Sequence, residues 1–175
     1  MGVVVGPEGV EQLLAADGTP QLAAPLRWCR WADRGEFWDA WDLAADHRNH
    51  PLPWTWQAGP DWLEQGPLVT AFRWRGRCGT SDLRLDGRLR AGCPWLELTL
   101  AVQWRQRHEL LRLEVPLARP AVRWAADSAG AVLERPAVAH TAREQARWEV
   151  SAVSWLASVG DGRHPQGAGV AVLLD

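Results

Sequence analysis

Residues 96–104 read Leu-Glu-Leu-Thr-Leu-Ala-Val-Gln-Trp, and large apolar residues occupy every second position of this run. A period of two places these side chains on one face of an extended chain and leaves the other face to water. An amphipathic helix needs a period of 3.6 residues instead. We therefore expect a β-strand with one buried face.

A second run, residues 111–117 (LRLEVPL), alternates in the same way, and the polar stretch 105–109 separates the two runs. We expect the two runs to pair as a hairpin with its turn in this stretch. Pro116 lacks a backbone N–H, so the end of the second strand should lie at a sheet edge or a bulge.

Further strand signals lie on both sides of these runs. Asp-Gly and Gly-rich pairs between apolar stretches are typical of hairpin turns. We expect a hairpin with a turn at 76–79 between strands at 68–75 and 82–89, a strand pair over 3–14 associated with an Asp17-Gly18 turn, and a final strand at 170–174.

Helical signals are short and lie only at residues 37–45 and 142–148. Many short strands separated by Gly and Pro, without β-α alternation, predict an all-β fold, an antiparallel β-sandwich with little helix. Residues 47–60 contain three prolines and read as a long loop. We expect one domain over residues 1–175, because no linker or low-complexity tract divides the chain.

Charge and hydropathy exclude several classes of function. The 175 residues carry 19 basic and 21 acidic side chains, dispersed along the chain, which argues against a nucleic-acid-binding face. The sequence has no apolar run of membrane-spanning length, and residues 1–7 lack the basic and apolar regions of a secretory leader, so we expect a soluble chain that is not secreted. The three cysteines are odd in number and lack the C-x-x-C spacing of a zinc site, which favours a reducing, cytoplasmic location.

The chain contains no Lys, Tyr or Ile, and 13 of its 15 aromatic residues are Trp. Codons for the missing residues are A/T-rich, so we expect a GC-rich and bacterial genome. Most of the tryptophans should then pack where Tyr and Phe pack in other proteins.

Two short motifs could support chemistry. His47 and His50 have the H-x-x-H spacing of metal ligands, but the prolines after them favour a loop over a metal-binding helix. Asp39 and Asp42, each preceded by a tryptophan, resemble the paired carboxylates of a glycosidase. The alternative is local capping and packing, which we favour on composition alone.

The same residues resemble a known family. Residues 37–43 (FWDAWDL), followed by Asp46 and by Pro-Leu-Pro at 51–53, resemble the WDAWDI stretch in the C-terminal region of family 38 glycoside hydrolases, the zinc-dependent α-mannosidases. Other segments resemble family motifs in the same order along nearly the whole chain. They are residues 92–97 (GCPWLE), 104–112 (WRQRHELLR, like WHERHKLLK), 132–136 (VLERP), 146–150 (ARWEV) and 167–171 (GAGVA).

The resemblance implies a β-sandwich of the galactose-mutarotase-like supersandwich type, which in the family packs beside an N-terminal catalytic α/β barrel. That barrel carries the family's zinc ligands, nucleophilic Asp and acid/base Asp, and these 175 residues include none of it. The resemblance thus implies no catalytic residue and no zinc in this chain, whose partners are its own N-terminal catalytic domain and α-mannoside glycans. Retaining hydrolysis belongs to the barrel.

We carry three hypotheses forward. In the first, the chain supports the barrel of an α-mannosidase-like hydrolase and lines its sugar site. The residues that would meet the barrel or the substrate are Trp38, Asp39, Trp41, Asp42 and Arg135. Packing within the domain is the alternative role of all five.

In the second hypothesis, the chain is a free-standing carbohydrate-binding module. Such a module needs exposed indoles on one surface, and Trp54 and Trp56 are the candidates for this platform. In the third, it is a scaffold domain with an exposed apolar patch.

Overall fold

The structure is a computed structural model that describes residues 1–35, 43–147, 149–160 and 169–174. Every pair of neighbouring strands in it is antiparallel, which confirms the predicted all-β fold. The elements are β1 (Gly2–Gly6), β2 (Gly9–Leu14), β3 (Arg27–Ala32), the 3-10 helix η1 (His47–Asn49), β4 (Pro51–Leu52), β5 (Trp56–Gln65), β6 (Val69–Cys78), β7 (Ser81–Arg90), β8 (Leu96–Gln103), β9 (Glu109–Glu114), β10 (Arg123–Ser128), β11 (Ala131–Pro136), α1 (Ala142–Gln145), β12 (Trp155–Val159) and β13 (Ala171–Leu173).

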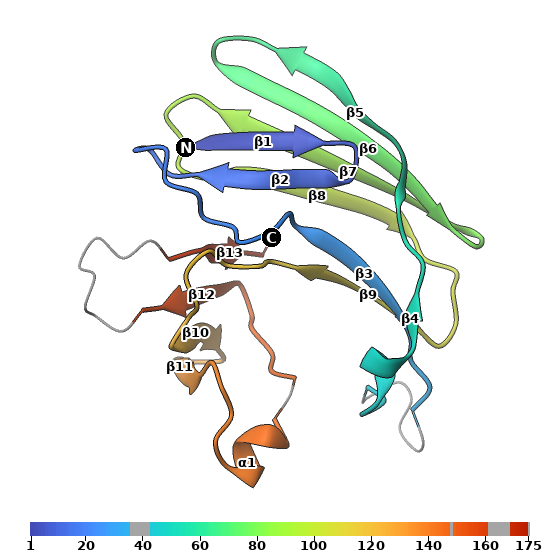
Figure 1. The fold of residues 1–175 in the computed structure, drawn as a ribbon, viewed down its shortest axis with the longest axis vertical. Helices are drawn as coiled ribbons and strands as arrows, with labels where there is room; N and C mark the ends of the chain where they lie inside the picture. Colours follow the sequence, from blue (N-terminus) through green and yellow to red (C-terminus); the bar gives the residue numbers. More distant parts are fainter. Residues whose placement is uncertain (36–42, 148, 161–168, 175) are drawn as a thin grey trace. The chain divides into compact units, whose positions relative to one another are not determined.

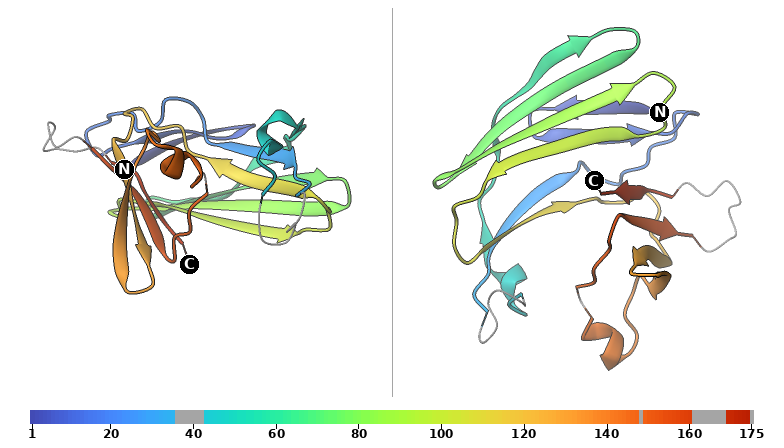
Figure 2. Two further views of the ribbon diagram at one scale, coloured as in Figure 1. Left: turned by 90° about the horizontal axis from the view of Figure 1, so that it is seen from below. Right: turned by 180° about the vertical axis from the view of Figure 1, so that it is seen from behind.

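The chain divides into two compact units, Met1–Pro116 and Leu117–Asp175, and each is described by itself. The first unit holds the β1-β2 hairpin, a sheet in the order β4-β3-β9, and a long sheet in the order β5-β6-β7-β8 (Figure 1). Seen from below in Figure 2, the blue strands of this unit lie over the green strands of the long sheet. That the whole chain is one domain stays a prediction.

The core of the first unit lies between these layers. Phe72, Trp74, Leu83 and Leu85 of the long sheet are buried, and Trp28 and Leu113 of the β3-β9 pair pack against their cluster. Each of these strand residues alternates with an outward polar neighbour, as the period of two requires. The sequence pattern therefore predicts which face of these strands is buried.

Tryptophan fills much of this core. The indole N–H of Trp74 donates to the Gly6 carbonyl at 2.9 Å and so fastens the β1-β2 hairpin to the long sheet. Phe72 lies 5.1 Å from Trp74, ring centre to ring centre, and sits directly over Gly87. A Cβ atom at Gly87 would lie 1.9 Å from the Phe72 ring, so glycine is the residue that fits there.

The predicted hairpin of residues 96–104 with 111–117 is wrong. β8 pairs with β7, while β9 pairs with β3, so residues 104–108 cross from one layer to the other. Gln106 holds this crossing, because its amide donates to the Cys78 carbonyl at 2.9 Å and to the Ser81 hydroxyl at 3.1 Å. Both strands bury their leucines in the same core from opposite sides, which local alternation does not distinguish from pairing.

The other predicted strands are confirmed with shifted turns. β6 and β7 form the expected hairpin, but its turn falls at 79–80 because both strands extend further. β1 and β2 turn at 7–8, and the predicted Asp17-Gly18 turn instead follows β2. The final strand is β13, and the short helix α1 begins at a capping box formed by Thr141 and Glu144.

The second unit is a four-stranded sheet in the order β11-β10-β12-β13. Large apolar side chains are exposed across this unit, and within its described residues only Ala125 and Ala126 are buried apolar residues. The exposed ones are Val122, Val132, Leu133, Val138, Val150, Val153, Leu173 and Leu174. Among the described residues, no helix has the length and apolar character needed to cross a membrane.

Candidate sugar-site and interface residues

Four of the five candidate residues, Trp38, Asp39, Trp41 and Asp42, lie outside the described residues. The structure does describe the positions that flank them. The Asp33 carboxylate accepts a hydrogen bond from the Ala44 backbone N–H at 2.8 Å. The predicted roles of the four residues stay predictions.

The two histidines of the H-x-x-H motif lie in η1 and directly after it. His47 is buried with its ring edge-on to Trp31, and its Nδ1 lies 2.7 Å from the Ala44 carbonyl. His50 instead contacts the Asp46 carboxylate at 3.0 Å and holds the pKa of Asp46 below its usual range. His47 therefore packs in the interior, and His50 makes a surface contact.

A metal site needs several His, Cys, Asp or Glu side chains close together. Across the part of the chain that the structure describes, no group of three or more His, Cys, Asp or Glu side chains is arranged to hold a metal ion. The three cysteines are free thiols, and burial raises the pKa of Cys78 and of Cys29. The described residues therefore do not fit a zinc ion.

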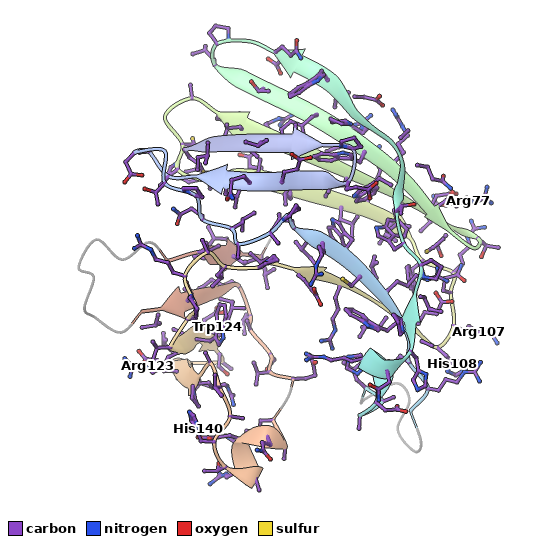
Figure 3. All side chains as sticks on the ribbon, viewed as in Figure 1. Arg77, Arg107, His108, Arg123, Trp124 and His140 are labelled. Carbon is purple, nitrogen blue, oxygen red and sulfur yellow. The ribbon has the colours of Figure 1, made fainter. Side chains whose placement is uncertain are left out.

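Arg135 is the one candidate that the structure describes. It lies on edge strand β11, half-buried, directly opposite Trp124 of β10. The neighbouring pair of charges, Arg123 and Glu134, lies on the other face of the sheet, with 3.1 Å between nitrogen and oxygen. Figure 3 labels Trp124 and Arg123 on β10. Among the described residues Arg135 has no ion pair, so its guanidinium retains donors for a partner outside this unit.

The proposed platform of Trp54 and Trp56 is wrong. Trp56 is buried in the core, Trp54 is half-buried, and the two rings pack edge to face with centres 5.3 Å apart. Trp62 and Trp95 are the tryptophans with large exposed fractions among the described residues, at 49% and 47%. Trp56 lies three residues after Pro53 in a stretch that reads as a loop, but it is the first residue of β5, and the strand alternation turns it inward.

Sequence reasoning also missed Asp127, which organises the second unit. Its carboxylate accepts hydrogen bonds from the backbone N–H groups of Val153, Ser154 and Trp155 and from the Ser154 hydroxyl. These donors stabilise the charged form and lower the pKa of Asp127 to about 2. No local signal identifies this role, because the bonded residues lie at least 26 positions away in sequence.

The sequence also matches a known protein family. The profile of the glycosyl hydrolases family 38 C-terminal domain matches residues 2–175. The chain belongs to this family. This match to the family 38 C-terminal domain confirms the resemblance that the ordered motifs of the sequence indicated.

Two relatives are named α-mannosidase 2C1, one from Mus musculus and one from Homo sapiens. Each is 29% identical to this family 38 domain over 122 residues, which are 69% of this chain and 12% of the relative. The domain therefore spans about one eighth of the length of the relatives it matches.

Proposed function

We propose that this chain is the non-catalytic C-terminal domain of an α-mannosidase-like hydrolase. One observation carries the proposal: the family 38 C-terminal profile covers residues 2–175, while the matched α-mannosidases extend far beyond the matched segment. Hydrolysis of α-mannosides, with the zinc and the catalytic carboxylates, belongs in this proposal to an N-terminal catalytic domain of the longer polypeptide. The free thiols are in keeping with a reducing, cytoplasmic location.

The domain contributes surfaces to that polypeptide. Trp38, Asp39, Trp41 and Asp42 contact the catalytic domain or the sugar in this proposal. Arg135 supplies a second contact from the other unit, since a half-buried guanidinium with free donors suits a carboxylate or a sugar hydroxyl. The exposed apolar side chains of the second unit match a surface that is covered in a larger assembly.

The test uses the longer polypeptide that contains this chain. We expect it to hydrolyse a chromogenic α-mannoside, to lose this activity with a zinc chelator, and to regain it when zinc is added back. The 175-residue chain alone serves as the control and should show no turnover. Chelator-resistant turnover, or no turnover of any α-mannoside by the longer polypeptide, would contradict the proposal.

A further inference from the structure

The outer face of the long sheet carries a dense array of charges. The register places outward side chains at odd positions of β6, even positions of β7 and odd positions of β8. The charged residues on this outer face come from β6, β7 and β8 and from the β5 positions that lie opposite outward residues of β6. The arginines are Arg73, Arg75, Arg77, Arg84, Arg88 and Arg90, and the carboxylates are Asp61, Glu64, Asp82, Asp86 and Glu97.

Most of these charges are held in ion pairs. Arg73 forms a two-point contact with Asp86, at 2.6 and 2.8 Å, and Arg75 contacts Asp61. Arg77, at the tip of the β6-β7 hairpin in Figure 3, lies 3.6 Å from Asp82. A paired guanidinium keeps its plane fixed and still has N–H groups that point away from the carboxylate. The face therefore offers donors and acceptors in fixed directions.

Trp95 lies at one corner of this face. Leu96 points inward and is paired with Leu89, so Glu97 points outward. Trp95 directly precedes β8, is 47% exposed, and its indole lies beside the Glu97 carboxylate. Arg90 contacts Glu97 at 3.0 Å, and Arg90 together with the nearby Trp95 indole lowers the pKa of Glu97. An exposed indole thus stands beside an oriented arginine–glutamate pair.

A pocket lies behind this corner, and neither Trp95 nor Glu97 lines it. It has a volume of about 340 Å³ and is lined by the loops 66–68 and 91–94, by Met1 and Ala16 next to the β1-β2 hairpin, and by the inward positions Thr70 and Leu89, so it opens behind the sheet and not on its outer face. Leu68 adds an exposed apolar side chain to its wall. The outer face therefore offers an exposed indole and fixed polar groups as an open surface and not as a hollow.

The charge balance indicates the class of ligand. Six arginines stand against five carboxylates on this face, so its net charge is close to zero and it does not attract a polyanion. A neutral molecule with many hydroxyl groups can donate to the carboxylates and accept from the guanidinium groups. The apolar C–H face of a sugar ring matches the flat, amphipathic surface of an indole.

We infer that the outer face of the β5-β8 sheet binds a neutral carbohydrate, with Trp95 stacking on a sugar ring and the Arg90–Glu97 pair binding its hydroxyl groups. This inference uses none of the candidate residues of the proposed function. It does not rest on the proposed α-mannosidase activity, because the chain would bind the sugar through its own residues.

The test is affinity electrophoresis of the 175-residue chain in native gels that contain α-mannan, dextran or heparin. We expect α-mannan or dextran to retard the chain and heparin to leave its mobility unchanged. Trp95→Ala should weaken the retardation about tenfold, which corresponds to about 1.4 kcal/mol for the lost stacking contact. Glu97→Gln should weaken it as well, because a carboxylate accepts stronger hydrogen bonds than an amide.

Trp62→Ala is the matched control, because Trp62 is equally exposed but packs edge-on against Phe72 of the inner face, with ring centres 5.8 Å apart. An unchanged far-ultraviolet circular dichroism spectrum and an unchanged urea-unfolding midpoint show that each variant is folded. The inference would be overturned if neither neutral polysaccharide retarded the chain, or if heparin alone did. It would also be overturned if Trp95→Ala were retarded as strongly as the unmodified chain. Any of these results would leave the α-mannosidase proposal standing.

Discussion

Asp127 fixes the start of β12 with one carboxylate. It accepts three consecutive backbone N–H groups and one hydroxyl, and its pKa falls to about 2. An unfolded aspartate has a pKa of about 3.9. Because the folded pKa is the lower one, the carboxylate contributes stability above pH of about 4, and this contribution is lost as the pH falls toward 2.

This contribution can be followed residue by residue. In the unmodified chain we expect the amide NMR signals of Val153, Ser154 and Trp155 to shift with an acid midpoint near pH 2. Asp127→Asn should abolish this transition and speed amide exchange at Ser154 about tenfold at neutral pH, because a charged acceptor is lost. A midpoint near pH 4 in the unmodified chain would contradict the hydrogen-bond network.

Single residues also show where sequence reasoning was sufficient. The expectation that tryptophan takes the packing role of Tyr and Phe holds for Trp74, which is fully buried. The platform of Trp54 and Trp56 failed, because the exposure of an aromatic residue depends on which layer covers it. Trp95 was quoted only as part of a family motif, since its exposure is set by strand pairing and not by its neighbours in sequence.

At the scale of elements, β3 and β9 are joined by two ion pairs of different burial. Arg30 binds both oxygens of Glu109, at 2.6 and 3.0 Å, and these side chains are 13% and 17% exposed. Arg27 binds Glu114 at the other end of the same strand pair, where the side chains are 62% and 37% exposed. The two pairs allow a matched comparison within one pair of strands.

Glu109→Gln should lower the free energy of unfolding by about 3 kcal/mol, because it leaves the Arg30 guanidinium nearly buried without its counter-charge. Glu114→Gln should change the free energy of unfolding by less than about 1 kcal/mol, because water and salt screen the exposed pair. Urea unfolding of both variants measures the difference. Equal losses from the two substitutions would show that burial does not set the strength of these pairs.

The sequence predicts well which segments form strands, and less well which strands pair with each other. Alternation identifies β8 and β9 as strands with buried leucines, but it does not say whether the two pair or face each other across a core. The crossing at residues 104–108 depends on Gln106 and its long-range bonds to Cys78 and Ser81, which no local pattern encodes. The all-β class survives this error because it depends on strand content and not on connectivity.

At the scale of the whole molecule, the order of the motifs carried more information than any one motif. The segments from residues 37–43 to 167–171 resemble the family in sequence order, and the family profile then matched residues 2–175. The candidate site was predicted less completely. Trp38, Asp39, Trp41 and Asp42 lie outside the described residues, and Arg135 was identified as a candidate without knowledge of Trp124 opposite it.

We propose that this domain supports catalysis without performing it. The most direct measurement compares kcat/KM for α-mannoside hydrolysis between the longer polypeptide and the same polypeptide from which residues 1–175 are removed. We predict that removal abolishes hydrolysis, because the catalytic domain loses the surface that packs on it, while residues 1–175 alone hydrolyse nothing. Unchanged hydrolysis without these residues, or hydrolysis by these residues alone, would contradict the account.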